Sequence, residues 1–464
     1  MTTPAAFPHP QWRLPIMGDV FTTDLVTPCQ GLAKDLAAHG GIVEQRLFNR
    51  SFLITSRADL INDINDETTW EKHVSPSLEK LRAVAGDGLF TAFNDEPNWS
   101  KAHNILAPAF TKTAMSSYHA SMNATVDELI DTWTIAAERD QWIDVTSEAN
   151  RLTTEIVARV GIGHSFNRLG DTTTDPFITT VQRQLKFANR RTDAIPFYDK
   201  LFRQDDLKQH VADKAALLAQ VAELITARRA APLESGTDML DIMLNTADPA
   251  TGDRLDDANI INQILTLLVA GSETSANAIA FALHYLAQNP AIADAAREEV
   301  DQRWPESTVP DFAFDDVAKL RYLRRIVDET LRLWPIAPGY FRKAKVDTTI
   351  GPEAYPFEAG GWIFVLLLAA HRDPAAWGPD AAEFDPDRFL TDRIRELPAH
   401  VYKPFGTGAR ACIGRQFAIH EIVLSLAAIL HQFDLEPEQG YTLKVSETMT
   451  LKPDSLRLRL HRRR

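Results

Sequence analysis

Cysteine is nearly absent from this sequence, whose 464 residues include only Cys29 and Cys412, far apart and outside any CxxC pair. This usage excludes a disulfide scaffold and a cysteine-rich zinc site, and it is typical of a reducing, cytoplasmic compartment. Positive charge is also in deficit, because 49 Lys and Arg face 63 Asp and Glu and leave a net charge of −14. The balance argues against nucleic acid as a partner and gives no reason for attraction to anionic membranes.

Long hydrophobic runs, repeats and flexible linkers are missing too. The longest apolar runs, 264–271 and 362–370, fall short of the roughly 20 residues that cross a bilayer. The first residues lack the basic and then apolar pattern of a signal peptide. We therefore expect no membrane anchor, and we expect one domain over residues 1–464 because no composition boundary divides the chain.

Most of the chain has the apolar spacing of helices, as at 126–137. The stretch 259–288 is apolar on all sides, follows Asp256 and Asp257 as possible caps, and stops at Asn289-Pro290. A helix this long and apolar is expected to cross the middle of the protein. Strand patterns lie near 40–60, with a possible turn at Asn49-Arg50, and near 340–370, including 344–350 and 362–367. The sequence therefore predicts a mainly α fold with a smaller β portion.

Residues 405–414, FGTGARACIG, surround the second cysteine with unusual chemistry. Gly406 and Gly408 permit a tight backbone path, and Arg410 places a cation near the sulfur. After Gly414, the apolar stretch 417–430 predicts a helix, and a helix N-terminus stabilises a nearby thiolate. A lone cysteine is more often a small buried hydrophobe. Here its surroundings favour a metal ligand.

This segment resembles the haem-binding signature of cytochrome P450 enzymes, F-x-x-G-x-R-x-C-x-G. Each fixed position is matched, by Phe405, Gly408, Arg410, Cys412 and Gly414. The resemblance implies a long central helix over haem b, with the loop 405–414 holding the cofactor and Cys412 as the axial thiolate. A thiolate ligand pushes electron density onto iron and favours O–O cleavage. By the same resemblance, Arg410 pairs with a haem propionate and Phe405 packs near the sulfur.

A second motif, E-x-x-R, is formed by Glu329 and Arg332, which share one helix face at this spacing. On its own the pair suits an exposed surface, where it would contribute little to stability. The resemblance instead implies a buried structural triad with Arg388 of the PDRF segment at 386–389.

The long apolar helix is interrupted by Ala270-Gly271-Ser272-Glu273-Thr274, where an unpaired carboxylate would be costly. The P450 resemblance implies an acid–alcohol pair beside the oxygen-binding face of the haem. Ala270 and Gly271 would belong to that face, with Gly271 admitting oxygen. Thr274 would hydrogen-bond the oxygen, and Glu273 would relay protons.

The remaining predicted contacts concern the propionates and the substrate. Trp99 and His103 form a W-x-x-x-H pair where the family often has Arg as the last residue, and Arg342 resembles a propionate-binding basic residue. Each also suits a plain structural role, as a helix histidine or a strand-edge arginine. Phe90 and Ala337 are expected to line the substrate pocket, although Phe90 also suits the core.

The resemblance extends over nearly the whole chain and is strongest to the haem domain of bacterial self-sufficient fatty-acid hydroxylases. It is carried by the segments 85–110, 270–283 and 411–437. Those proteins continue into a reductase that carries FAD and FMN, whereas this chain ends about where a haem domain would. We expect an excised domain, or a separate diflavin reductase or ferredoxin as electron donor.

The expected activity is therefore a haem-thiolate monooxygenase that uses O2 and NADPH on a small apolar substrate. A medium- or long-chain fatty acid is the expected substrate, although Phe48 and Phe52 stand where that branch anchors the carboxylate. Two alternatives stay open. A peroxide-driven peroxygenase is disfavoured by the Glu273-Thr274 pair, and a non-catalytic haem sensor would not need a proton relay.

Overall fold

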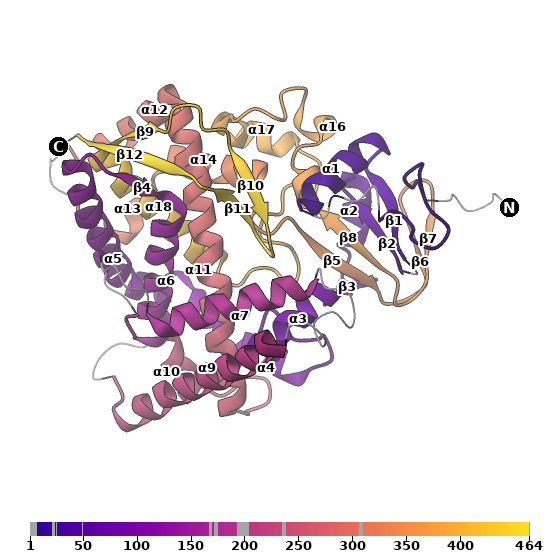
Figure 1. The fold of residues 1–464 in the computed structure, drawn as a ribbon, viewed down its shortest axis with the longest axis horizontal. Helices are drawn as coiled ribbons and strands as arrows, with labels where there is room; N and C mark the ends of the chain where they lie inside the picture. The colour runs from indigo at the N-terminus through magenta and orange to yellow at the C-terminus, as the bar shows by residue number, and fades with distance from the viewer. Residues whose placement is uncertain are drawn as a thin grey trace.

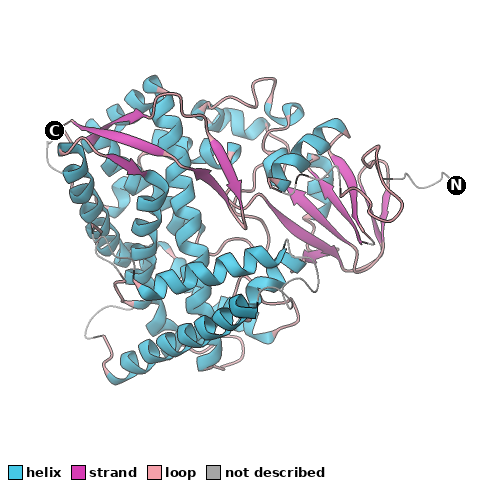
Figure 2. Cartoon of the chain, in the orientation of Figure 1, coloured by secondary structure: helices cyan, strands magenta, loops and turns pink. Residues whose placement is uncertain are grey.

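The computed structural model describes residues 7–20, 24, 26–48, 50–166, 169–170, 175–192, 204–233, 238–305 and 310–463. Helices make up most of this part of the chain, and the strands lie in two places, one at the right of the view and one across its upper left and centre (Figure 2). The longer helices are α1 (Pro28–Ala38), α3 (Pro76–Ala85), α4 (Pro97–Leu106), α5 (Lys112–Glu138), α6 (Val145–Ile162), α7 (Pro176–Thr192), α9 (Gln204–Ala230), α11 (Asp257–Gln288), α12 (Pro290–Asp301), α14 (Arg321–Leu333) and α18 (Arg415–Gln432). The mainly α prediction is confirmed.

Short helices connect these elements: α2 (Ala58–Ile64), α10 (Met239–Asn245), α13 (Phe314–Val317), α15 (Leu367–Ala370), α16 (Pro374–Trp377) and α17 (Thr391–Glu396). Two 3-10 turns, η1 (Ala107–Phe110) and η2 (Pro386–Phe389), join them. The proline-rich stretch 374–404 contains only such short pieces, because proline cannot continue a helix or donate to a sheet.

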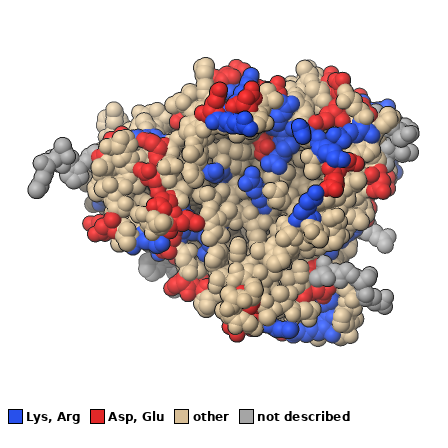
Figure 3. Space-filling model, turned by 180° about the vertical axis from the view of Figure 1, so that it is seen from behind, with Lys and Arg blue, Asp and Glu red and all other residues tan. Residues whose placement is uncertain are grey.

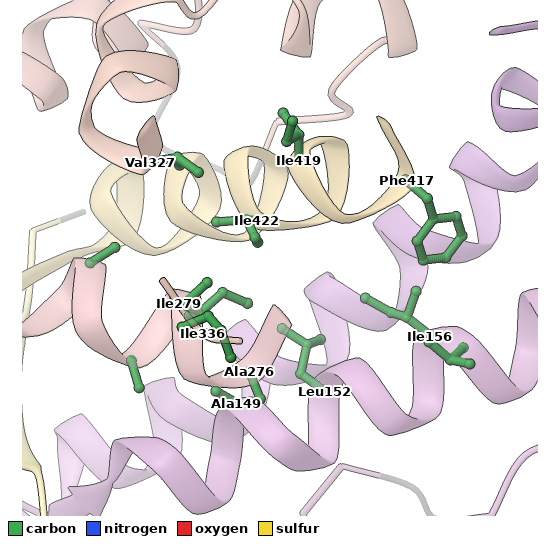
Figure 4. Close-up of a cluster of buried hydrophobic side chains, with 14 of the residues drawn as sticks. Ala149, Leu152, Ile156, Ala276, Ile279, Val327, Ile336, Phe417, Ile419 and Ile422 are labelled. Atoms are coloured by element: carbon green, nitrogen blue, oxygen red, sulfur yellow. The ribbon is translucent and has the colours of Figure 1, made fainter. Parts of the chain in front are cut away.

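The central helix α11 begins where Asp256 accepts a 2.8 Å hydrogen bond from the Asn259 backbone N–H, and it ends before Pro290 opens α12. Figure 4 shows Ala276 and Ile279 of α11 between Ile422 of α18 and Ala149 of α6. By length and composition α11 is able to cross a membrane, but 67% of its most apolar window is buried inside the protein. The helix is therefore the centre of the hydrophobic core, as the sequence predicts.

A five-stranded sheet joins the two predicted β regions in the order β1-β2-β8-β5-β3 (Figure 1). Its strands are β1 (Ile42–Leu47), β2 (Arg50–Thr55), β3 (Trp70–Lys72), β5 (Gly339–Ala344) and β8 (Trp362–Leu366). The hairpin β1–β2 is antiparallel, whereas β2 and β8 are parallel, with Leu53 opposite Ile363. Asn49, in the predicted turn, lies outside the described residues.

The predicted strand 344–350 is wrong in its bounds, because β5 ends at Ala344 and β6 (Thr348–Ile350) starts anew beside β7 (Tyr355–Phe357). Between them the Asp347 carboxylate accepts the Ala359 backbone N–H at 2.8 Å, which stabilises a bend. The sequence also missed β4 (Trp142–Asp144), β9 (Phe433–Pro437) and β12 (Arg457–Arg462), which form a three-stranded sheet, and the hairpin of β10 (Lys444–Glu447) and β11 (Leu451–Asp454).

Charge is unevenly distributed over the surface. Although the net charge is −14, many basic side chains lie over the upper centre and right of the rear face, with acidic side chains among them (Figure 3). Local potential rather than net charge governs how a charged partner approaches.

Candidate functional site

The loop 405–414 is held in a tight turn before α18. The Cys412 backbone N–H donates to the Phe405 carbonyl at 2.9 Å, and Gly406 and Gly408 have φ of +71° and +70°. A side chain at Gly408 would collide with the carboxylate of Glu67, which also accepts the Ala409 N–H at 2.9 Å. Glycine is required there both for its conformation and for space. No pattern in the sequence pointed to Glu67.

The Cys412 side chain is accessible, although protein packs around it on most sides. The protein packed around it raises the pKa of the thiol, while a hydrogen bond from the Gly414 N–H and the charge of Arg415 act in the opposite direction. Without another cation the protein therefore favours the neutral thiol. A bound metal ion reverses that preference, because a coordinating thiol loses its proton.

Three apolar side chains are exposed although many of their neighbours in the chain are buried. Ala270 is exposed in the middle of α11, between the buried residues Gln263–Thr266 and Ser275–Leu283. Ala337 is exposed directly after the buried segment Leu331–Ile336, and Phe90 is 41% exposed. Open faces of this kind inside a core indicate a ligand cavity.

Gly271 does not face the same way as Ala270. A Cβ atom at Gly271 would meet the Cγ2 of Val157 on α6 at 3.1 Å. The missing side chain thus allows α11 and α6 to pack closely, and its direction does not support the predicted role of Gly271 in admitting oxygen.

The acid and the alcohol of α11 both have partners. Thr274 donates its Oγ1 hydrogen to the Ala270 carbonyl at 2.7 Å. Glu273 accepts a 2.8 Å hydrogen bond from Oγ1 of Thr450, in the turn between β10 and β11. The carboxylate that looked isolated in the sequence is therefore partnered by a residue 177 positions away, which no local pattern reveals.

Two cations lie next to each other beside the loop. Arg410 stacks over the Trp99 ring at 4.6 Å and donates to the Ala92 carbonyl at 2.8 Å. Lys72, which the sequence missed, donates to the Phe90 carbonyl at 2.6 Å. Burial and the charge of Arg410 lower the pKa of Lys72 to about 7, and burial lowers that of Arg410 to about 10.

Neither cation forms an ion pair with a carboxylate in the described part of the chain. Neighbouring desolvated cations repel each other and therefore favour an anionic ligand between them. His103 stacks on Trp99 with a centroid separation of 5.2 Å, so the W-x-x-x-H pair adjoins this group.

The Arg342 side chain is hydrogen-bonded to backbone carbonyls away from Arg410. It is 3% exposed, and its guanidinium donates to the carbonyls of Ile64 at 3.1 Å and Trp70 at 3.3 Å. Burial lowers its pKa. These bonds hold Arg342 within the β-rich part, so Lys72 rather than Arg342 is the better second cation beside Arg410.

The E-x-x-R pair is buried, as predicted. Arg332 and Glu329 have no exposed side-chain surface and form a two-pronged ion pair with distances of 2.6 and 2.7 Å. Arg388 approaches Glu329 at 3.6 Å, but its shorter ion pair, 2.7 Å, is with Asp380. Arg332 also donates to the carbonyls of His371, Ala381 and Glu383, and so ties α14 to the segment after β8.

Comparison with known proteins agrees with this geometry. A profile of the cytochrome P450 family matches residues 8–459. A bifunctional cytochrome P450/NADPH–P450 reductase of Bacillus cereus is 38% identical over 98% of this chain and 42% of its own length. The bifunctional cytochrome P450/NADPH–P450 reductase 1 of Bacillus subtilis is 37% identical over 100% of this chain and 43% of its own length. The crystal structure of a cytochrome P450, CYP102L1, is 55% identical, with a TM-score of 0.94 and full coverage of both chains.

The fold and the cysteine loop thus define a haem-thiolate protein, and the chain belongs to the cytochrome P450 family. The chain spans about two fifths of the length of the curated relatives it matches, which continue into a reductase. The family's cofactor is haem b. The residues here fit it, since an accessible thiol, two desolvated cations and the open face at Ala270 suit its iron, its propionates and its flat ring.

Proposed function

We propose that this chain is the haem-binding part of a monooxygenase that hydroxylates a fatty acid of medium or long chain. The overall reaction is R–H + O2 + NADPH + H⁺ → R–OH + H2O + NADP⁺. Haem b, when bound, supplies the place where O2 binds and is reduced. The observation that carries the proposal is the pair Glu273 and Thr274 beside the open face of Ala270, in an otherwise apolar helix.

In this proposal Cys412 is the iron ligand, and Arg410, Lys72 and the Trp99–His103 pair hold the propionates. Phe405, Gly406 and Gly414 shape the loop that carries the thiolate. The desolvated cations favour the propionates because a charge-assisted hydrogen bond is about twice as strong as a neutral one.

Protons are handled by α11. The Thr274 hydroxyl already donates to the Ala270 carbonyl, so its oxygen lone pairs are directed to accept a further hydrogen bond. Glu273, one residue earlier and partly exposed, is able to exchange a proton with solvent. An acid beside an alcohol is the arrangement that general acid catalysis needs within direct or one-water reach.

The substrate proposal rests on an apolar cluster that packs α3 against α7, which we propose forms a wall of the substrate pocket. Val74, Leu78 and Leu81, in and before α3, pack with Ala188 of α7, and Phe93, Leu185 and Met449 join them. Such a wall suits an alkyl chain, and Phe90 and Ala337 would restrict how it reaches the haem. An optical titration of the purified protein with fatty acids of graded length tests this, because displacement of water from ferric haem shifts the spectrum. No shift with any chain length would refute the substrate class.

Electrons would come from NADPH through a diflavin reductase, as the names of the relatives indicate, or through a ferredoxin. The basic side chains of the rear face offer a surface for an acidic partner (Figure 3). We also propose the cytoplasm as the compartment, on the scarcity of cysteine.

Thr274→Ala tests the reaction. With reductase supplied, we expect continued NADPH consumption, more hydrogen peroxide and less hydroxylated product, at nearly unchanged substrate affinity. Ser272→Ala is a matched control, because the Ser272 hydroxyl makes the same kind of bond, to the Leu268 carbonyl at 2.6 Å.

Each other outcome contradicts a part of the proposal. Unchanged coupling in Thr274→Ala would refute the proton role. Product formed only with added peroxide would favour a peroxygenase, and no product under either condition would favour a haem sensor.

A further inference from the structure

The turn between β10 and β11 is anchored on several sides. At its start, the Glu447 carboxylate accepts the backbone N–H groups of Cys29 and Gln30 at 2.7 and 2.9 Å, at the beginning of α1. At its end, the Leu451 N–H donates to the Ile336 carbonyl at 2.9 Å, next to Ala337. A carboxylate at a helix N-terminus is favourable because the free N–H groups and the helix dipole attract it. The turn is therefore fixed relative to both α1 and the proposed pocket.

The middle of the turn is also packed. Met449 lies against the apolar cluster of Val74, Leu78 and Leu81 with Ala188 of α7. The residue that follows, Thr450, is thus held between this wall and α11.

The hydroxyl of Thr450 has a defined direction. Asn277 of α11 donates its Nδ2 hydrogen to Thr450 Oγ1 at 3.4 Å, and Thr450 donates to Glu273 Oε1 at 2.8 Å. A hydroxyl has one hydrogen to donate, and the amide of Asn277 occupies an acceptor direction. The hydrogen of Thr450 is therefore directed at the carboxylate of Glu273.

We propose that Thr450 is a positioning residue that fixes the carboxylate of Glu273 for proton delivery beside Thr274. The inference rests on the proposed function, in which Glu273 relays protons. The terminal torsion of a glutamate is broad and has no sharp preference of its own. A hydrogen bond from an anchored turn therefore selects one orientation.

The test compares three variants of the full chain with haem bound and reductase supplied. Thr450→Val keeps the shape and removes the hydroxyl, whereas Thr450→Ser keeps the hydroxyl. Thr448→Val is the control, because Thr448 is exposed in the same turn and, among the described residues, bonds the Thr450 carbonyl alone, with its hydroxyl at 3.5 Å and its backbone N–H at 3.1 Å. The readouts are product formed per NADPH consumed, the solvent isotope effect on that ratio, and the substrate dissociation constant.

A hydrogen bond to a charged group contributes a preference of roughly ten- to a hundredfold for the bonded geometry, and the lower end applies to a carboxylate that is partly exposed. We therefore expect Thr450→Val to lower the product ratio about three- to tenfold and to change the solvent isotope effect, with substrate affinity and melting temperature unchanged. Thr450→Ser should restore the ratio. A normal ratio in Thr450→Val, or a loss that serine does not restore, would overturn the inference.

Glu273→Gln separates this inference from the proposed function. If Glu273→Gln lowers the ratio and Thr450→Val adds nothing further in the double variant, the two residues act together as inferred. Additive losses would overturn the positioning role while leaving the function intact. An unchanged ratio in Glu273→Gln itself would refute the relay on which both depend.

Discussion

Replacement of Arg332 by Ala should test whether the E-x-x-R pair is structural. The Glu329–Arg332 pair has no exposed side-chain surface, and Arg332 also satisfies three backbone carbonyls. Removing one member of a buried pair costs about 3–5 kcal/mol, because the remaining charge is left unpaired. That is a large part of the roughly 5–15 kcal/mol that stabilises a typical domain. We therefore expect poor haem incorporation and a lower free energy of unfolding.

The pH dependence gives a second measurement on the same variant. Burial raises the pKa of Glu329, and the hydrogen bond from Arg332 opposes the rise. Without Arg332 the pKa rises further above that of the unfolded chain, so stability is lost as the pH increases through it. The deficit of Arg332→Ala should therefore be larger at about pH 8 than at about pH 5.

The assay is urea unfolding of the holoprotein, together with the ratio of haem to protein. The matched control is Arg325→Ala on the same helix, because Arg325 pairs with Asp387 at 2.6 Å with side chains 21% and 51% exposed. An exposed pair contributes about 1 kcal/mol or less. Full haem incorporation in Arg332→Ala, with a loss no larger than that of Arg325→Ala, would refute the argument.

Cys412→Ala should abolish the red-shifted Soret band of the reduced carbon monoxide complex, because the thiolate is its source; a retained band would show that another residue binds the iron. Phe90→Ala should shift the hydroxylation position along a fatty acid, because Phe90 is 41% exposed and is proposed to line the pocket, and an unchanged product distribution would contradict that role. Burial raises the pKa of Glu421 to about 8, with Ser275 opposing it, so stability should fall as the pH rises from about 5 to 8. Glu421→Gln should flatten this decline in urea unfolding, and parallel profiles for variant and parent would contradict the assignment.

The features predicted from sequence are those written in local patterns. The capped helix α11, the cysteine loop and the hairpin β1–β2 each depend on neighbouring residues, and each has the expected bounds or nearly so. The family signature added the burial of Glu329 and Arg332, which i,i+3 spacing alone does not establish.

The features that could not be predicted from the sequence are contacts between distant segments. Glu67 supports the cysteine loop, Lys72 stands beside Arg410, and Thr450 binds Glu273 only after the chain has folded. The carbonyl partners of Arg342, on Ile64 and Trp70, could not be predicted for the same reason, since they are set by how β5 lies beside β3. Nor does the sequence say which neighbour Gly271 approaches, which in the structure is Val157 of α6.

The parallel pairing of β2 with β8 also determines the order in which the protein can assemble. The hairpin β1–β2 forms within about 1–10 μs once its residues are available. Strand β8 pairs with β2 in parallel, with Ile363 opposite Leu53. At about 5–20 residues per second, β8 leaves the ribosome roughly 15–60 s after the hairpin. During this interval the edge of β2 has no partner and is open to pairing with other chains. A change in translation rate or in chaperone supply at this stage should therefore alter the yield of soluble protein. It should leave the stability of the folded protein unchanged.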